Sequence, residues 1–204
     1  MSSEHFNKEA ENWDNNPEKT ARAKIFAKKI VDFIQPSKKM KALEFGCGTG
    51  LLSFQLKNYF EVITLVDTSE GMIEVLKEKI KQLKIETFKP YLIDILEDPK
   101  NITKTDVIYT LMTMHHIENI DKAATIFHSL LNKNGYLCIA DLVEEDGTFH
   151  TTSQNFSGHN GFTKIELTEL LHNNGFEVIH YAICYEIIKN DKRYPLFLMI
   201  AKKV

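Results

Sequence analysis

A glycine-rich segment that begins with an acidic residue has the composition of a small-molecule binding loop. Glu44 is followed by Gly46, Gly48 and Gly50, and the short apolar segment 41–45 leads into them. Glycine permits the positive φ angles of a sharp turn from a strand into a helix, and it lets a ligand approach the backbone closely. The helix that follows such a turn presents unpaired N–H groups and a partial positive charge. The segment therefore predicts a site for a ligand with an anionic group.

The spacing of these residues separates two ligand classes. A dinucleotide-binding loop reads G-x-G-x-x-G, and Leu51 stands here at the place of the third glycine. A carboxylate at Glu44 would repel a pyrophosphate, but it can neutralise an ammonium group. S-adenosylmethionine carries a carboxylate, an ammonium and a sulfonium. The pattern favours this methyl donor, and a nucleotide-dependent oxidoreductase stays the alternative.

Two further acids stand where strands are expected to end. Asp67 follows the β-branched segment 61–66, where a carboxylate can accept hydrogen bonds from both hydroxyls of a ribose. Asp94 follows the segment 87–93, where a carboxylate can accept from an adenine amino group. Met72 and Ile93 are candidates for contact with the adenine ring. These positions suit any adenosine-containing cofactor.

Histidines are the candidate groups for acid–base chemistry, because imidazole titrates near neutrality. His115 and His116 follow the expected strand 106–111, and His150 and His159 lie in the long segment 142–162. We expect His116, His115 or His150 to act on the substrate, while one of the paired histidines can equally brace its loop. The spacing from His150 to His159 matches no standard ligand motif, so no metal site is predicted.

Strand-like and helix-like segments alternate along the chain, which predicts a parallel sheet covered by helices on both faces. The last two strands are separated only by the polar turn 189–193, which can join only antiparallel neighbours. One antiparallel strand is therefore expected at the end of the sheet. Expected strands are 41–45, 61–66, 87–93, 106–111, 136–141, 176–188 and 195–202; expected helices are 18–34, 51–58, 68–83, 120–131 and 163–173.

The first 40 residues lack strand signals. We expect residues 1–36 to form a helical cap that covers one end of the sheet, and residues 37–204 to form the main domain. The aromatic residues of the segment 6–13 can close over a bound cofactor or anchor the segment against the core. Both alternatives remain open at this point.

Composition narrows the function classes. The 204 residues are 43% hydrophobic and 26% charged with a formal net charge of -3, which gives no support to a nucleic-acid partner. No apolar run approaches the roughly 20 residues that span a membrane. Cys47, Cys138 and Cys184 are predicted to be buried free thiols, as in a cytoplasmic protein. A monomer or homodimer that acts on a small molecule is expected.

The motifs together resemble the class I S-adenosylmethionine-dependent methyltransferases. The series is ALEFGCGTG, VDTSEGM, YLIDILE, DVIYTLMTMHH and NKNGYLCIADL, and the terminal segments FNKEAENWD and GFTKIELTELLHNNGFEV resemble small-molecule enzymes of the ubiquinone/menaquinone-biosynthesis type. The resemblance implies a Rossmann-like three-layer α/β/α sandwich with a seven-stranded, mostly parallel sheet and an antiparallel last strand. It also implies a set of cofactor contacts: Glu44, Phe45, Gly46, Cys47, Gly48, Gly50, Asp67, Thr68, Met72, Asp94, Ile95 and Leu111.

The expected activity is in-line displacement of the methyl group of S-adenosyl-L-methionine by a small-molecule acceptor, with S-adenosyl-L-homocysteine as product. A non-catalytic S-adenosylmethionine-binding module is the alternative within the same family. Nucleic-acid amino methyltransferases usually carry an Asn/Asp-Pro-Pro-aromatic motif after the fourth strand, and this chain has Met112-Thr113-Met114-His115 there. A protein substrate stays open.

Overall fold

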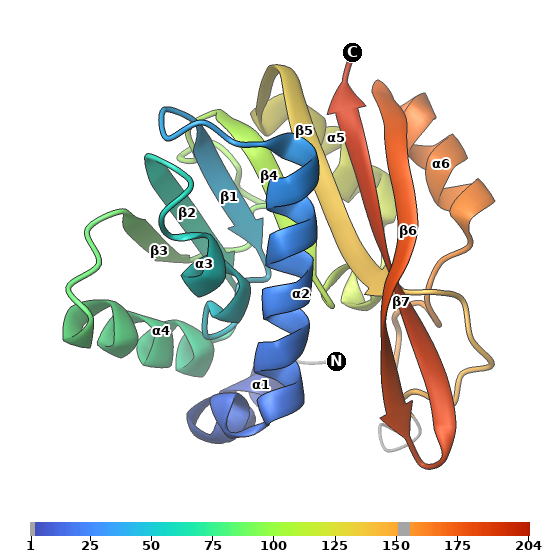
Figure 1. Ribbon diagram of the computed structural model, residues 1–204, viewed down its shortest axis with the longest axis horizontal. Coiled ribbons are helices and arrows are strands. Elements are labelled where there is room, and N and C mark those ends of the chain that lie inside the picture. The colour runs from blue at the N-terminus through green and yellow to red at the C-terminus, as the bar shows by residue number, and fades with distance from the viewer. Residues whose placement is uncertain (1–2, 151–155) are drawn as a thin grey trace.

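The computed structural model describes residues 3–150 and 156–204. In these residues a seven-stranded sheet has the order β3-β2-β1-β4-β5-β7-β6 (Figure 1). The strands are β1 (Lys41–Phe45), β2 (Val62–Asp67), β3 (Phe88–Leu92), β4 (Thr105–Leu111), β5 (Leu131–Leu142), β6 (Phe176–Lys189) and β7 (Lys192–Lys203). The helices are α1 (Ser3–Glu9), η1 (Ala10–Asn15), α2 (Pro17–Ile34), α3 (Leu51–Leu56), α4 (Glu70–Gln82), η2 (Met114–His116), α5 (Ile120–Leu130) and α6 (Lys164–Asn173).

The sheet separates two hydrophobic layers, as the alternation of its side chains requires. On β1, Ala42 belongs to the layer under α2, α3 and α4, whereas Leu43 and Phe45 belong to the layer under α5 and α6. Figure 1 shows α2 in front of the sheet and α5 behind it. The three-layer sandwich predicted from the sequence is confirmed.

The final hairpin confirms the antiparallel last strand but corrects its place. β7 runs antiparallel to both β5 and β6, and it lies between them, so that β6 forms the edge of the sheet. The connection is also tighter than the expected segment 189–193. Asn190 and Asp191 alone form the turn, both with positive φ angles (51° and 59°), which matches the right-handed twist of the two strands.

Two helix ends expected from the sequence need correction. The helix after the glycine loop ends at Leu56 rather than at residue 58. The helix α5 ends at Leu130, before Asn134 and Gly135, because the chain already pairs with β4 at Leu131. Asn134 has a φ of 62° and lies in the irregular start of β5, where the register shifts.

The N-terminal helix α2 lies over a face of the sheet and not over its end. Its buried residues Phe26 and Ile30 share one core with Tyr109 of β4, Cys138 of β5 and Leu198 of β7. Figure 1 shows α2 crossing the middle of the sheet. The helix therefore brings its first turns close to the carboxyl ends of the central strands.

Side chains at two helix starts bond to free backbone N–H groups. Ser69 caps α4 by accepting a hydrogen bond from the N–H of Met72, and Thr163 caps α6 by accepting from the N–H of Glu166. The Glu166 carboxylate in turn accepts from the Thr163 hydroxyl. Such caps satisfy backbone donors that have no partner within the helix.

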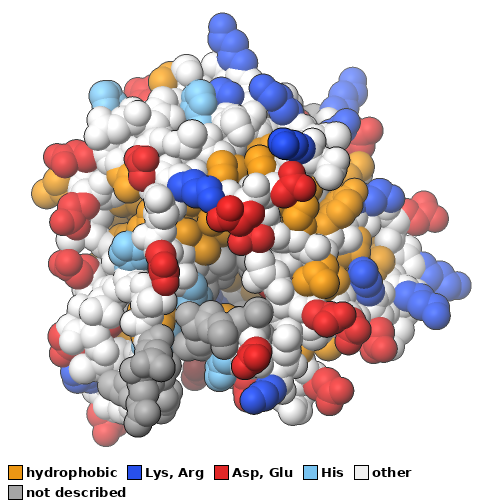
Figure 2. All heavy atoms as spheres, turned by 180° about the vertical axis from the view of Figure 1, so that it is seen from behind, with side chains coloured by type: hydrophobic (Ala, Val, Ile, Leu, Met, Phe, Trp, Pro, Cys, Tyr) orange, Lys and Arg blue, Asp and Glu red, His pale blue; other side chains and the backbone are white. Residues whose placement is uncertain are grey.

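Among the described residues, neither the surface charges nor the cysteines indicate a functional site. Figure 2 shows acidic and basic side chains interspersed over one face. Within the described ranges, no helix combines the length and the apolar composition that crossing a membrane requires. The three cysteines are free, as predicted; Cys47 and Cys138 are buried, but Cys184 is only half-buried.

Candidate active site

A cavity of about 260 Å³ lies where the carboxyl ends of β1, β2 and β4 meet. Ligands of open α/β sheets bind at this edge. Its walls come from the glycine loop, the segments after β2, β3 and β4, and the N-terminal helices. The lining residues are Phe6, Trp13, Lys19, Arg22, Glu44–Thr49, Leu51, Leu52, Val66–Thr68, Met72, Ile93, Asp94, Leu96, Leu111–Thr113, His116 and Ile117.

At Gly46 the glycine loop has no room for a side chain. Gly46 has a φ of 65°, and a Cβ there would lie 2.2 Å from Cγ2 of Thr113, so the segment after β4 packs directly on the loop backbone. Gly48 has a φ of 51°, and its N–H donates to Oδ2 of Asp67 at 2.7 Å. The loop thus joins the ends of β1, β2 and β4 in one wall of the cavity.

Glu44 is a buried carboxyl group at the floor of the cavity. Its residue is 3% exposed, and Oε2 accepts hydrogen bonds from the N–H (3.2 Å) and the hydroxyl of Ser53. Burial raises the pKa of Glu44 to about 8, and only the Ser53 hydrogen bonds oppose that shift strongly. Among the described residues it has no ion-pair partner. A cation in the cavity would restore its ionised form.

Asp67 lies on the cavity wall at the end of β2. Its two carboxylate oxygens accept from the N–H groups of Gly48 (2.7 Å) and Ser69 (2.8 Å). Burial raises the pKa of Asp67, and these backbone hydrogen bonds oppose the rise. Each oxygen keeps a lone pair for a hydroxyl donor.

The N-terminal segment is hydrogen-bonded to the glycine loop and to helix α4 with the residue before it. Asn7 Oδ1 accepts from the Ser69 hydroxyl (2.7 Å) and from the N–H of Gly71 (3.0 Å). Asp14 accepts from the Thr49 hydroxyl and from Lys79 Nζ, both at 2.5 Å. Polar side chains therefore anchor the segment, and Phe6 and Trp13 line the cavity, while closure over a bound cofactor stays a prediction.

Two cations on the cavity wall were not expected from the sequence. Lys19 Nζ lies 3.1 Å from the centre of the Trp13 ring, and burial together with the charge of Arg22 lowers the pKa of Lys19 to about 8. Burial also lowers the pKa of Arg22, and its buried Nε has no hydrogen-bond partner among the described residues. The i, i+3 spacing of Lys19 and Arg22 on an expected helix was the one sequence signal that they lie side by side.

Three histidines gather at the end of the cavity beside β4 and β5. His116 lines the cavity, and His115 packs against it with ring centres 4.0 Å apart. His115 is 1% exposed, and its Nδ1 lies 2.5 Å from Oδ1 of the buried Asp141. His150 lies 5.1 Å from His115 and 5.3 Å from His116, between ring centres. Sequence analysis named these three histidines, but it gave no sign that Asp141 is hydrogen-bonded to His115.

Electrostatics keeps two of these rings neutral. Burial, followed by repulsion from His115 and His150, lowers the pKa of His116 to about 2. Burial, followed by repulsion from His115 and Lys189, lowers the pKa of His150 to about 4. Both are therefore weaker proton acceptors at neutral pH than the sequence implied.

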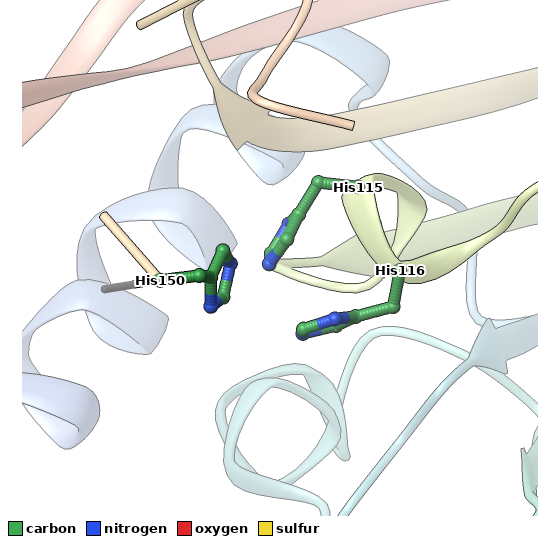
Figure 3. Close-up of side chains that lie close together, drawn as sticks. All are labelled: His115, His116 and His150. Carbon is green, nitrogen blue, oxygen red and sulfur yellow. The ribbon is translucent and has the colours of Figure 1, made fainter. Parts of the chain in front are cut away.

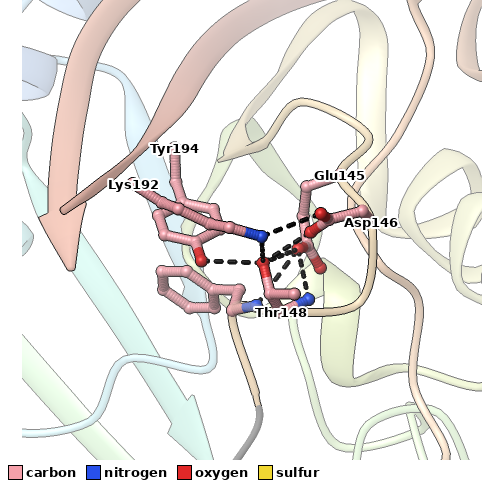
Figure 4. A network of polar contacts seen from close by, with 6 residues as sticks. Glu145, Asp146, Thr148, Lys192 and Tyr194 are labelled. Carbon is pink, nitrogen blue, oxygen red and sulfur yellow. Dashed lines mark hydrogen bonds and ion pairs between the residues drawn. The ribbon is translucent and has the colours of Figure 1, made fainter. Parts of the chain in front are cut away.

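The segment after β5 is held by a polar network that includes the final hairpin (Figure 4). Lys192 Nζ contacts Oδ2 of Asp146 at 2.9 Å, and the Tyr194 hydroxyl lies 2.9 Å from that of Thr148. Glu145 Oε2 accepts from the N–H groups of Thr148 and Phe149. The chain next to His150 is thereby fixed.

His159 serves as a brace for the loop that carries the paired histidines. Its backbone N–H donates to the carbonyl of His115 at 2.7 Å, and its Nε2 lies 3.3 Å from the carbonyl of Glu118. His159 does not line the cavity.

Most of the predicted cofactor residues line this cavity, and two do not. Gly50 has a φ of 83° and occupies the N-cap position of α3, behind the wall. Ile95 is fully buried in the core under α5. Asp94 lines the cavity but is exposed, and its Oδ1 also accepts from the N–H of Leu96 at 2.9 Å. Contact with a cofactor stays a prediction for every member of the set.

Comparison with known proteins places the fold and the glycine loop in one family. The family described as "Methyltransferase domain" matches residues 36–197. An uncharacterized methyltransferase of Schizosaccharomyces pombe is 30% identical over 148 residues, which are 66% of this chain and 52% of that protein. A ubiquinone biosynthesis O-methyltransferase of Pelagibacter ubique is 35% identical over 115 residues, 56% of this chain and 47% of that protein. The chain thus spans about half the length of these curated relatives.

Solved structures share the fold at low sequence identity. A SAM-dependent methyltransferase from Aquifex aeolicus superposes with a TM-score of 0.73 and 17% identity, covering 100% of both chains. The [4+2]-cyclase SpnF superposes with a TM-score of 0.72 and 12% identity, covering 88% of this chain and 80% of that one. On the family match, the glycine loop and the sheet topology, this chain belongs to the class I S-adenosylmethionine-dependent methyltransferases.

Proposed function

We propose that the chain binds S-adenosylmethionine in the cavity and transfers its methyl group to a small-molecule acceptor by in-line displacement. The observation that carries the proposal is that one cavity joins the buried carboxyl of Glu44 and the glycine loop to the histidine end at His116. When bound, the cofactor supplies a methyl group activated by the sulfonium. The residues of the chain bind and orient the cofactor and the acceptor, and they exclude water.

The polar groups of the cavity fit the cofactor in charge. The Glu44 carboxyl can pair with the ammonium of the methionine part, and the Arg22 guanidinium can pair with its carboxylate. The free lone pairs of Asp67 suit the ribose hydroxyls. Each of these groups is buried or half-buried and lacks an ion-pair partner among the described residues, so a zwitterionic ligand would relieve the cost of burying them.

The acceptor end of the cavity is small and partly apolar. Phe6, Thr113, His116 and Ile117 line it, and Phe6 packs edge-on against His116 with ring centres 5.5 Å apart. A closed wall of this kind aligns the reactants and removes water, which can supply much of the rate of a displacement. These features favour a small acceptor, and the named O-methyltransferase relatives support an oxygen atom as the attacking group.

Calorimetric titration with S-adenosylmethionine, S-adenosylhomocysteine and NADH tests the cofactor. We expect micromolar binding of the first two, loss of that binding in Asp67→Ala, and none for NADH. Tighter binding of NADH would reject the proposal in favour of an oxidoreductase. A panel of small hydroxylated acceptors, read by release of S-adenosylhomocysteine, then tests transfer; binding without turnover across the panel would favour a non-catalytic module.

A further inference from the structure

Three histidine side chains from two separate segments converge beside the cavity. One ring nitrogen of each of His115, His116 and His150 lies within 4.8 Å of the others. Figure 3 shows the three rings turned toward a common space, with His150 approaching from the segment after β5. We propose that this cluster is a binding site for a divalent transition-metal ion, and that Zn²⁺ is the ion its three imidazoles fit best.

The hydrogen bond between His115 and Asp141 supports the assignment. Asp141 is fully buried, and its Oδ1 lies 2.5 Å from Nδ1 of His115, so that Nε2 is the ring nitrogen left available to a metal ion. A carboxylate in this position fixes the tautomer and the direction of a metal-binding imidazole. Asp141 is itself held, because its oxygens also accept from the N–H groups of His115 (3.3 Å) and Leu142 (2.7 Å).

The other two rings are also placed before an ion arrives. His116 is packed between His115 and Phe6, and its buried Nδ1 has no hydrogen-bond partner among the described residues. His150 is stacked on Phe156 with ring centres 4.0 Å apart, and it follows the segment fastened by Lys192 and Tyr194. Only small movements are needed, because nitrogens around a tetrahedral Zn²⁺ lie about 3.4 Å apart at Zn–N distances of about 2.0–2.1 Å.

The place of the cluster indicates what the ion would do. Three protein ligands leave one position open, as in catalytic zinc sites, and His116 also lines the cavity. An ion there would bind an oxygen atom of the acceptor and lower its pKa. Because three imidazoles bring no negative charge to the ion, the fourth ligand that best balances the charge is an oxygen anion, from a hydroxyl or carboxylate group. This role rests on the proposed function, but binding of the ion does not.

Metal uptake by the full chain, prepared without a polyhistidine tag and stripped with a chelator, tests the inference. We expect calorimetry to give one Zn²⁺ per chain, and Co²⁺ to give the visible absorption of a four-coordinate nitrogen site. His150→Gln should weaken Zn²⁺ binding at least tenfold without unfolding the chain, because His150 is only half-buried. Asp141→Asn should weaken it about 10- to 100-fold as the loss of a positioning residue. His172→Gln, which changes an exposed histidine of α6, is the matched control and should bind like the parent chain.

Absence of stoichiometric Zn²⁺ and Co²⁺ uptake would overturn the inference. So would uptake that is equally strong in His150→Gln, because the ion would then lie elsewhere. Titration of the stripped chain with S-adenosylmethionine separates this failure from failure of the proposed function. Cofactor binding without metal uptake removes only the metal site, whereas metal uptake without cofactor binding removes only the proposed methyl transfer.

Discussion

Substitution of Glu44 by glutamine should make the free protein more stable and the cofactor complex weaker. The carboxyl is 3% exposed, and burial raises its pKa to about 8. Glutamine keeps the size of the side chain and an oxygen that can accept from Ser53, but it has no charge to bury. Stability and cofactor affinity change in opposite directions, because the charge of Glu44 destabilises the free protein but pairs with the ammonium of the bound cofactor.

The gain in stability follows from proton linkage. The pKa of the group is about 8 in the folded chain against 4.5 for an unperturbed carboxyl. Between these values the folded state holds a proton that the unfolded state has lost, so the free energy of unfolding decreases as the pH rises, by about 1.4 kcal/mol per unit. At pH 7 the penalty reaches about 3 kcal/mol. Glu44→Gln should remove it, raising the melting temperature by roughly 6–12 °C, with no difference at pH 4.5 or below.

The loss of cofactor affinity has its own pH signature. Only ionised Glu44 can pair with the ammonium, so cofactor binding must expel the proton that the folded chain holds. Between pH 5.5 and 7.5, where an α-amine of pKa about 8 stays protonated, affinity of the parent chain for S-adenosylhomocysteine should rise up to about tenfold per pH unit. Calorimetry in two buffers of different ionisation enthalpy should count nearly one proton released. Glu44→Gln should bind weakly with no such slope.

Two results would refute this reasoning. A Glu44→Gln chain that melts below the parent at pH 7.5 would show that the carboxyl stabilises the free protein, so its pKa is not raised. Cofactor affinity that is flat from pH 5.5 to 7.5, with no proton released, would show that Glu44 does not change its ionisation on binding.

Three further substitutions test other parts of the site and the core. Arg22→Gln should weaken binding of S-adenosylhomocysteine about 10- to 100-fold in calorimetry, which is the value of a charged hydrogen bond. The ligand 5′-methylthioadenosine lacks the carboxylate and should bind both chains equally. Equal losses for both ligands would contradict the pairing of Arg22 with the carboxylate. Gly46→Ala should abolish cofactor binding in the same assay, because its Cβ would meet Thr113 at 2.2 Å at a φ of 65°; parent-like affinity would contradict the close packing. Phe127→Ala should lower the free energy of unfolding by about 3–5 kcal/mol in urea, since Phe127 is fully buried against Phe45; a loss below 1 kcal/mol would show that the core can collapse around the gap.

The sequence predicted those parts of the fold that depend on local rules. A strand, a glycine turn and a helix follow one another at residues 44–51, where Gly46, Gly48 and Gly50 all have positive φ angles, which glycine adopts most readily. The short polar segment 189–193 predicted an antiparallel last strand, because so short a connection cannot join parallel neighbours. The alternation of strand-like and helix-like segments along the chain predicted the remaining elements.

Local rules did not decide where elements lie relative to one another. The insertion of β7 between β5 and β6 is set by the pairing of Leu196–Lys202 with β5 across the sheet, which no turn signal encodes. The position of α2 follows from Phe26 and Ile30, whose apolar stripe fits a face or an end of the sheet equally well when read from the sequence. The end of α5 was misplaced because strand pairing at Leu131 outweighs the turn tendency of Asn134-Gly135.

The histidine cluster shows why site prediction stopped where it did. Spacing along the chain compares neighbours in sequence, and by that measure His150 and His159 were a pair without a ligand motif. In space His159 turns to the backbone of His115 and Glu118, while His150 joins His115 and His116. The segment that leads to His150 is bonded to the final hairpin, for example through Lys192 Nζ and Asp146 Oδ2, which lie 46 positions apart in the sequence. The expectation of no metal compared His150 with His159 along the chain, whereas the proposed site combines His150 with His115 and His116, and metal uptake by the stripped chain tests it.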